Sequence, residues 1–483
     1  MGLVRRGLMG AGAGALLAWP TTIAPPALAA SALYMGGTFN ELSVPQESPD
    51  FISFYIGTMD ARYVEPTGLC SGGDPACLPL GVYTPEQLFP LTGLRDLDYD
   101  GSVAAGAANL DACLRGRPCI VTDPPYTATT TRVLTDTSYT VLGYSQSATV
   151  ASEEKEALIA APVDADVNFV FVANPNRPNG GILERFVGGY FPILGVSFSG
   201  ATPTDSDPSA PLTTVDIARQ YDFVADFPTN PLNPLALVNS IFGYYLIHLQ
   251  PFDVKEPELQ GQYQDSTYYL DPAETLPLLL PLAGVPLLGP LLAGVLDPPL
   301  RVLVEAGFDR TLNPGAPTPA TIFYFPDPIA TAVNLVVAIG TGLDNGIAYV
   351  TGDPTNRPLG TAIPGPYGVG GPPVNAGAID PYGPPVPYAA LQPTAMSARA
   401  DVADVGAEDV GSDGVAGEDV ADHSDAGPRR TNQRHRVVGV QPVAGAVAEH
   451  PLQVVRQRPG RVAADVHPVR DRLVDHRKMP NDV

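Results

Sequence analysis

Basic residues are scarce in this chain of 483 residues, which carries 27 Lys and Arg against 51 Asp and Glu and a formal charge of −24. Proteins bind nucleic acids chiefly through Lys and Arg contacts to phosphates, so we expect no nucleic-acid partner. The acidic, lysine-poor composition suits a soluble exported protein. The length is sufficient for one full hydrophobic core with extensions.

Cysteine is also scarce, and its four copies fall into two close pairs, Cys70 with Cys77 and Cys113 with Cys119. Neither pair has Cys-x-x-Cys spacing and no histidine lies nearby, so we do not expect a zinc site. We expect no other metal and no cofactor. In an exported chain the pairs favour two small disulfide loops, although four cysteines allow three connectivities and the sequence does not decide among them.

Long uninterrupted apolar runs are lacking. Residues 1–30 combine Arg5-Arg6, a short apolar run and a small-residue cleavage pattern, which is the signature of an export signal rather than of a membrane span. A second run, residues 276–300, is rich in leucine but broken by prolines that prevent a continuous membrane helix. Two interpretations of this run stay open: a lid-like or lipid-facing wall over a site, and a buried proline-rich excursion.

Aromatic residues are absent from residues 396–483, and valine and aspartate alternate there without a helical or strand period. Such a segment cannot bury enough apolar surface to offset its ordering entropy, so we expect a disordered, low-complexity tail. A shifted reading frame is an alternative origin for it. Residues 313–395 are rich in proline and glycine and are expected to form an extension, with a helix over residues 330–349.

The stretch from Ser138 to Ser152 predicts a strand, a tight turn and a helix, with Ser145 on the turn. This is the pattern of a nucleophile elbow, Gly-x-Ser-x-Gly, in which small residues let the strand and helix backbones pass closely. Ser147 replaces the last glycine. The alternative is an ordinary strand-to-helix turn in which Ser145 is a surface hydroxyl.

The surrounding pattern predicts further strands over residues 31–35, 167–173 and 213–221, and helices over residues 101–114 and 147–161. Residues 51–56 fit a strand or a helix equally. Strands alternating with helices indicate an α/β fold with a doubly wound, mainly parallel sheet, whose sites lie at the carboxyl ends of the strands. Residues 31–312 are therefore expected to form one α/β-hydrolase domain.

A nucleophilic serine needs a base, and histidine is suited to that role at neutral pH. Five of the six histidines lie in the predicted tail, so elimination leaves His248. Asp222 follows a predicted strand and precedes His248, as the orienting carboxylate of this fold should; Asp226 is the alternative acid. For the oxyanion we expect the N–H of Gln146 and the loop at Gly37 and Thr38, unless that loop is merely a turn.

Taken together, the motifs resemble the PE-PPE C-terminal domain family, cutinase-like serine α/β-hydrolases of actinobacterial cell-envelope proteins. The resemblance covers residues 33 to 309. It is carried by Met35-Gly36-Gly37-Thr38, Pro90-Leu91-Thr92-Gly93-Leu94, Ser102-Val103-Ala104-Ala105-Gly106, Gly143-Tyr144-Ser145-Gln146-Ser147, Asn174-Pro175-Asn176-Arg177-Pro178-Asn179-Gly180-Gly181, Arg219-Gln220-Tyr221-Asp222 and Ala225-Asp226-Phe227-Pro228.

The resemblance implies a secreted or cell-envelope esterase or lipase that uses Ser145, Asp222 and His248 on an acyl ester or envelope lipid. It also accounts for Ser147, because the family tolerates serine there. One alternative is an acyltransferase that moves acyl chains onto a sugar acceptor of the trehalose type. Another is a non-catalytic cell-envelope interaction protein. A peripheral association with membrane or cell wall is a further expectation.

Overall fold

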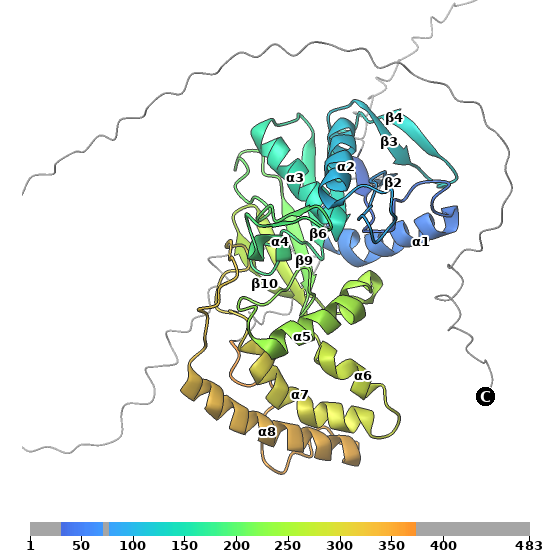
Figure 1. Cartoon of the computed structure of the whole chain (residues 1–483). Helices are drawn as coiled ribbons and strands as arrows, with labels where there is room; N and C mark the ends of the chain where they lie inside the picture. The colour runs from blue at the N-terminus through green and yellow to red at the C-terminus, as the bar shows by residue number, and fades with distance from the viewer. Residues whose placement is uncertain (1–29, 71–76, 373–483) are drawn as a thin grey trace, which may run out of the picture. The chain divides into compact units, whose positions relative to one another are not determined.

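A nine-stranded sheet organises the computed structural model, which describes residues 30–70 and 77–372 (Figure 1). The strands lie in the order β10-β11-β9-β6-β5-β1-β2-β3-β4. Neighbours from β11 to β2 pair in parallel, whereas β10, β3 and β4 pair antiparallel at the two edges. The bounds are β1 Ala30–Tyr34, β2 Leu78–Val82, β3 Pro118–Thr122, β4 Thr129–Val133, β5 Ser138–Tyr144, β6 Asp166–Val172, β9 Thr214–Arg219, β10 Glu258–Tyr263 and β11 Ser266–Asp271. The α/β-hydrolase fold class is thereby confirmed.

Helices cover both faces of the sheet. The α-helices are α1 Pro49–Met59, α2 Tyr99–Leu114, α3 Gln146–Ala160, α4 Ile182–Arg185, α5 Pro234–Gly243, α6 Leu280–Ala283, α7 Gly289–Glu305 and α8 Pro328–Thr351. Short π and 3₁₀ turns are η1 Asp60–Val64, η2 Glu65–Thr67, η3 Tyr244–His248, η4 Pro251–Asp253 and η5 Pro277–Leu279, and a separate hairpin pairs β7 Tyr190–Phe191 with β8 Val196–Ser197.

The central strands are apolar on both sides because each face of the sheet is buried. In β5, Val141 packs into the core under α2 and α3, while its neighbour Leu142 packs into the core on the α1 side. Phe169 and Val170 of β6 divide in the same way. Successive side chains of a strand point to opposite faces, so a continuous apolar run supplies two cores at once.

Strand order reverses at β1, which has β5 on one side and β2 on the other. In doubly wound sheets the crevice at such a reversal, beyond the carboxyl ends of the strands, is where ligands bind. The loop Gly36-Gly37-Thr38 follows β1, and Ser145 follows β5. The topology therefore brings the two predicted parts of the site together.

The ambiguous residues 51–56 belong to α1. Ser48 is the N-cap, its side chain accepting from the N–H of Phe51, and Pro49 begins the helix. Proline suits the first helical position because its missing N–H has no partner there in any case. The start signals decide in favour of a helix where the apolar run alone did not.

The proline-rich run of residues 276–300 forms η5, α6 and most of α7, with Pro298 and Pro299 inside α7. α7 packs against α8 (Figure 1), and a Cβ on Gly342 of α8 would lie 2.1 Å from the carbonyl oxygen of Val295. The helix expected over residues 330–349 is α8. The export segment and the tail expected over residues 396–483 lie outside the described residues, except that Ala30 already begins β1.

Both disulfides predicted from the cysteine pairs are present, Cys70 with Cys77 and Cys113 with Cys119. The second disulfide joins the end of α2 to β3. Among the described residues no group of three or more His, Cys, Asp or Glu side chains could hold a metal ion.

Candidate active site

Ser145 lies on the turn between β5 and α3, with φ 57° and ψ −117°. Serine rarely adopts a positive φ, and residues held in such conformations cluster at functional sites. The turn is fixed from outside, because the Ser145 N–H donates to the carbonyl of Val172 in β6 at 3.0 Å. The side chain is thus raised above the carboxyl edge of the sheet.

The residues flanking Ser145 show why the turn needs small side chains. A Cβ on Gly143 would lie 2.5 Å from the carbonyl oxygen of Ser147, so no larger residue fits there. Ser147 is accommodated because its hydroxyl folds back onto the turn: it accepts from the Tyr144 N–H at 2.9 Å and donates to the Tyr144 carbonyl at 3.2 Å. The serine in place of glycine therefore ties the turn together.

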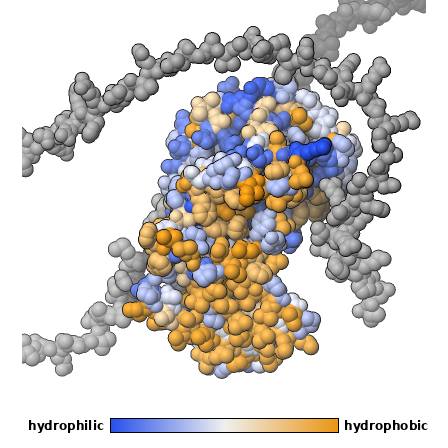
Figure 2. Space-filling model, in the orientation of Figure 1, coloured by the Kyte–Doolittle hydropathy of each residue, from blue (hydrophilic) through white to orange (hydrophobic). Residues whose placement is uncertain are grey.

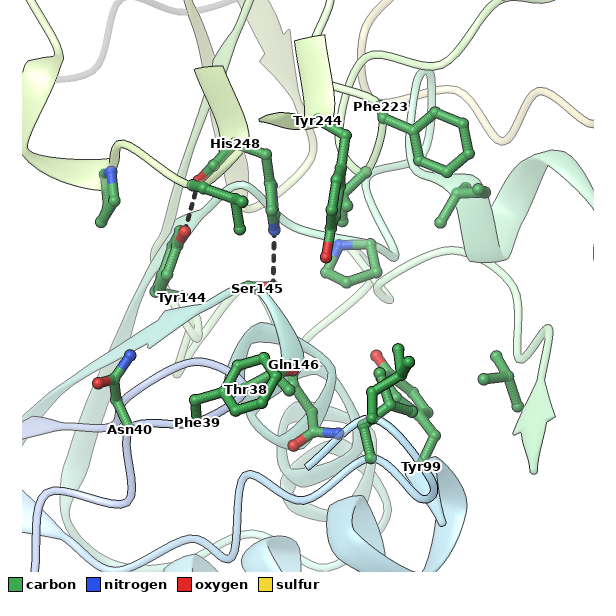
Figure 3. Close-up of a pocket in the computed structure, with 18 of the residues that line it drawn as sticks. Thr38, Phe39, Asn40, Tyr99, Tyr144, Ser145, Gln146, Phe223, Tyr244 and His248 are labelled. Carbon is green, nitrogen blue, oxygen red and sulfur yellow. Dashed lines mark hydrogen bonds between the residues drawn. The ribbon is translucent and has the colours of Figure 1, made fainter. Parts of the chain in front are cut away.

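Three polar side chains form one hydrogen-bonded chain. Ser145 Oγ lies 2.9 Å from His248 Nε2 (Figure 3), and His248 Nδ1 lies 3.0 Å from each carboxylate oxygen of Asp222. His248 and Asp222 are buried. Asp222 lies three residues after the end of β9. His248 is the last residue of the π turn η3, which continues α5. Single π turns inside helices occur frequently at functional sites.

Two tyrosine rings enclose the imidazole of His248 (Figure 3). The Tyr244 ring stacks on it with centroids 5.4 Å apart, and the Tyr144 ring stacks on the other side at 5.6 Å. The Tyr144 hydroxyl donates to the His248 carbonyl, and burial raises the pKa of Tyr144 well above its ordinary value. The two stacked rings and the hydrogen bond to the His248 carbonyl therefore fix the orientation of the imidazole.

Asp226, the alternative acid, has different partners. Its carboxylate pairs with Arg310 at 2.6 Å and accepts the Tyr221 N–H at 2.8 Å. Tyr221, which has a positive φ of 68°, precedes Asp222. Asp226 therefore holds the backbone that presents Asp222, and Asp222 is the carboxylate that contacts His248.

The loop after β1 is shaped by its glycines. A Cβ on Gly36 would lie 1.8 Å from the Asn40 carbonyl oxygen, and one on Gly37 would lie 2.8 Å from the Tyr144 ring. Thr38 lines the cavity beside Ser145, whereas Gly37 packs behind it against Tyr144. Within the described part of the chain, no hydrogen bond from the Thr38 N–H is found. That N–H is therefore available to a bound group.

Gln146 begins α3 with its backbone N–H at the helix N-terminus and its side chain buried. The side-chain amide donates to the Gln87 carbonyl at 2.8 Å and accepts from Ser102 at 3.3 Å. One residue earlier, the Glu86 carbonyl accepts the Phe39 N–H at 3.0 Å. Residues 86–87 therefore form a strut that fixes both the Gln146 side and the Thr38 side of the cavity.

Glu86 itself is buried at this strut, with φ 51°. Thr84 donates to Oε1, but Oε2 has no hydrogen-bond partner among the described residues. Burial raises the pKa of the Glu86 carboxyl well above its ordinary value. A neutral carboxyl avoids the cost of an unpaired buried charge next to the loop.

The cavity above Ser145 has a volume of about 640 Å³ and a mainly apolar lining. Its lining includes residues of α1 and of the segment after His248, among them Phe51, Tyr55, Leu249 and Phe252. It also includes residues from 182–198 together with Leu88, Tyr99 and Phe223. No residue of the proline-rich run 276–300 lines this cavity, so that run is not its wall.

Sequence reasoning named Ser145, His248, Asp222, Gln146 and Thr38, and the structure brings these five residues together. It missed Tyr144, Tyr244 and the strut at residues 86–87. The tyrosines could have been suspected because Tyr144 adjoins Ser145 and Tyr244 precedes His248 by one helical turn. The strut carried no local signal.

Comparison with known proteins places this site in a family. Residues 75–309 match the PE-PPE domain. The chain carries a PE-PPE domain. Ser145, Asp222 and His248 all lie inside the matched residues, while β1 and the Gly37-Thr38 loop precede them.

Relatives of this PE-PPE domain come from Mycobacterium tuberculosis. Esterase PE16 is 40% identical over 303 residues, which are 59% of this chain and 53% of the relative. The uncharacterized PPE family protein PPE42 is 36% identical over 330 residues, 66% of this chain and 51% of the relative. SL1278 acyltransferase Chp1 is 29% identical over 255 residues, 50% of this chain and 55% of the relative. The chain spans about half the length of these curated relatives. No solved structure matches the chain.

Proposed function

We propose that the PE-PPE domain of this chain is a serine ester hydrolase acting on acyl esters through Ser145, His248 and Asp222. The observation that carries the proposal is the 2.9 Å contact between Ser145 Oγ and His248 Nε2 on a turn with the backbone of a nucleophile elbow. The relative named as an esterase, at 40% identity, supports the same reaction class.

In the mechanism, Ser145 Oγ attacks the ester carbonyl carbon while His248 Nε2 takes its proton. Asp222 accepts the Nδ1–H and stabilises the imidazolium. The tetrahedral oxyanion accepts hydrogen bonds from the N–H groups of Gln146 and Thr38, with Gly37 giving the loop its close approach. His248 then gives the proton to the leaving alcohol oxygen as the ester bond breaks, which leaves an acyl group on Ser145.

Deacylation repeats the steps with water as the nucleophile. His248 takes a proton from water, the hydroxyl oxygen bonds to the acyl carbon, and the proton returns to Ser145 as the acid departs. The apolar cavity of about 640 Å³ suits the acyl chain of a lipid ester. No metal or cofactor takes part in these steps.

Acyl transfer to a sugar hydroxyl is the second candidate, and it is favoured by the relative named as an acyltransferase. The acyl-enzyme is common to both reactions, and only the second nucleophile differs. Incubation with an acyl ester in the presence and absence of trehalose distinguishes them. An acylated sugar supports transfer, whereas free acid alone supports hydrolysis.

A fluorophosphonate probe tests the shared step. We expect the full chain to be labelled and the Ser145→Ala variant to be unlabelled. Equal labelling of both proteins, or no labelling of either, would contradict the catalytic proposal and leave a non-catalytic envelope protein as the better account. A Ser152→Ala variant is the matched control, because this hydroxyl on α3 bonds to Thr202 and not to the turn.

The compartment is also a proposal. Two disulfides form readily in an oxidising extracellular environment and are rare in the cytosol. They support secretion or residence in the cell envelope. Detection of the mature protein in culture filtrate or envelope fractions, with an N-terminus near Ala30, would test this.

A further inference from the structure

The helical layer formed by α6, α7 and α8 has almost no charged residues. Residues 276–304 contain only Asp297 and Arg301, which pair with each other at 2.7 Å. Residues 328–351 contain only Asp344, which is buried and accepts from the N–H groups of Leu359 and Thr361. Glu305, the last residue of α7, pairs with Arg310. Every charged side chain within α6, α7 and α8 is therefore paired or hydrogen-bonded, and the exposed carboxylates Asp327 and Asp353 flank the two ends of α8.

α8 exposes a broad apolar face. Apolar side chains three or four residues apart stand along the helix with 37 to 76% of their surface accessible: Ile329, Val333, Val336, Ile339, Leu343, Ile347 and Val350. Within the described residues α8 is the one helix long and apolar enough to cross a membrane by length and composition. Its other face packs on α7 through Gly342 and Gly346. The face of α8 that remains accessible is therefore apolar, as in helices that lie along a lipid interface.

The apolar surface continues beyond α8. The turn before α7 exposes Leu287 and Leu288, and the loop before α8 exposes Phe323 and Phe325, of which Leu287 is 89% accessible and Phe323 is 82% accessible. Figure 2 shows hydrophobic side chains gathered over this part of the molecule, in contrast to the more hydrophilic region over β3 and β4. Soluble proteins rarely expose large contiguous apolar patches unless these bind something.

The shape of this surface indicates what covers it. A second copy of the chain would bury one continuous patch. The exposed apolar side chains instead stand in three places: on the face of α8, on the turn before α7 and on the loop before α8. A lipid phase can surround all three. The negative formal charge opposes both self-association and attraction to anionic surfaces, so contact must come from burial of apolar side chains.

The surface also leads toward the cavity above Ser145. Val238, Ile241, Tyr245 and Leu249 are exposed along α5 and its π turn. Leu249 lines the cavity, and Ile241 and Tyr245 line a small groove that shares Phe223 and Tyr244 with it. α5 packs on α7, so the apolar row joins the helical layer to the mouth of the site.

We infer that the α6–α8 layer docks this protein onto an uncharged lipid surface, with α8 lying in the interface and the α5 row giving acyl chains a path to the cavity. The docking goes beyond the proposed esterase chemistry and does not depend on it. Because no exposed basic residue takes part, binding should be insensitive to salt.

Vesicle flotation tests the inference with the full-length chain carrying Ser145→Ala, so that binding is measured without turnover. We expect binding to neutral phosphatidylcholine vesicles that is equal at about 50 mM and about 500 mM salt. A Leu287→Asp/Phe323→Glu/Val336→Glu variant should bind at least about tenfold more weakly. Ile120→Glu/Val133→Glu, which charges exposed apolar residues on β3 and β4, should bind as the parent does.

Each result decides the question. The folding of the triple variant is checked by restoring Ser145 and measuring turnover of a soluble short-chain ester. If the chain is not an esterase, near-ultraviolet circular dichroism of the triple variant checks its folding instead. Absence of vesicle binding by the parent, or equal binding by all three proteins, overturns the inference. So does a parent that ignores vesicles but sediments as a dimer that the triple substitution dissociates, since the surface would then join two copies.

Discussion

His248 Nδ1 lies 3.0 Å from both carboxylate oxygens of Asp222, and both residues are buried. Asp222 Oδ1 also accepts the Val224 N–H at 2.7 Å, which fixes the carboxylate. The contact holds the imidazole so that Nε2 faces Ser145. A carboxylate in this position sets the tautomer of the histidine and stabilises its cation during attack.

The first prediction separates the two candidate acids. Asp222→Asn should lower kcat by about 10³–10⁴-fold with little change in folding, because the neutral amide no longer stabilises the imidazolium and its NH₂ group can donate to Nδ1, which holds the imidazole in the wrong tautomer. Asp226→Asn should instead lower the free energy of unfolding by about 3 kcal/mol, because the buried Arg310 loses one of its charged partners. Urea unfolding and kcat per folded molecule check both. Loss of kcat in the Asp226 variant alone would reverse the assignment.

The second prediction concerns the rings around His248. Tyr244→Leu should lower kcat on a soluble short-chain ester about tenfold, because one face that stabilises the imidazolium is lost. Tyr245→Leu is the matched control: Tyr245 is adjacent in sequence and contacts the Tyr244 ring edge rather than the imidazole. Equal kcat for the two variants would show that stacking does not assist catalysis.

The third prediction tests the strut at residues 86–87. Gln146→Met keeps the backbone N–H but removes the bonds to Gln87 and Ser102, so kcat should fall at least about tenfold while KM changes little. Ser152→Ala serves as control, since it removes a buried hydroxyl from the same helix, bonded to Thr202. An unchanged kcat in Gln146→Met would mean that the oxyanion donors are held without the strut.

Local patterns account for what the sequence predicted well. Ser145 lies where a strand, a turn and a helix follow one another directly, so a short window contains the whole elbow. His248 was singled out because the other five histidines lie in the last part of the chain. The parallel strands were predictable because burial on both faces leaves continuous apolar runs.

Long-range contacts account for what the sequence did not reveal. The strut joins Gln146 to Gln87, 59 residues away, through an amide that no local motif marks. The edge strand β10 lacks a regular apolar alternation, since Gly261 lies at a register shift in its pairing with β11. The proline-rich run gave two interpretations because lining a cavity and packing on α8 require the same apolar side chains.

The last prediction concerns Glu154, which is buried on α3 and whose Oε1 has no hydrogen-bond partner among the described residues. Burial raises the pKa of its carboxyl to about 8, with Asp111 adding to the effect. The folded protein therefore holds this proton more tightly than the unfolded chain does. By linkage, the stability contribution is fully present below the unfolded pKa of about 4.5 and is lost as pH rises to about 8.

Glu154→Gln should leave the free energy of unfolding nearly unchanged at low pH and raise it by at least about 2 kcal/mol above pH 8. Urea unfolding from about pH 5 to about pH 9 measures the difference. Glu156→Gln, on the exposed side of the same helix, is the control. If the two variants behave alike, Glu154 is charged in the folded protein and the cost of its burial is met by Arg115 and Arg117 nearby.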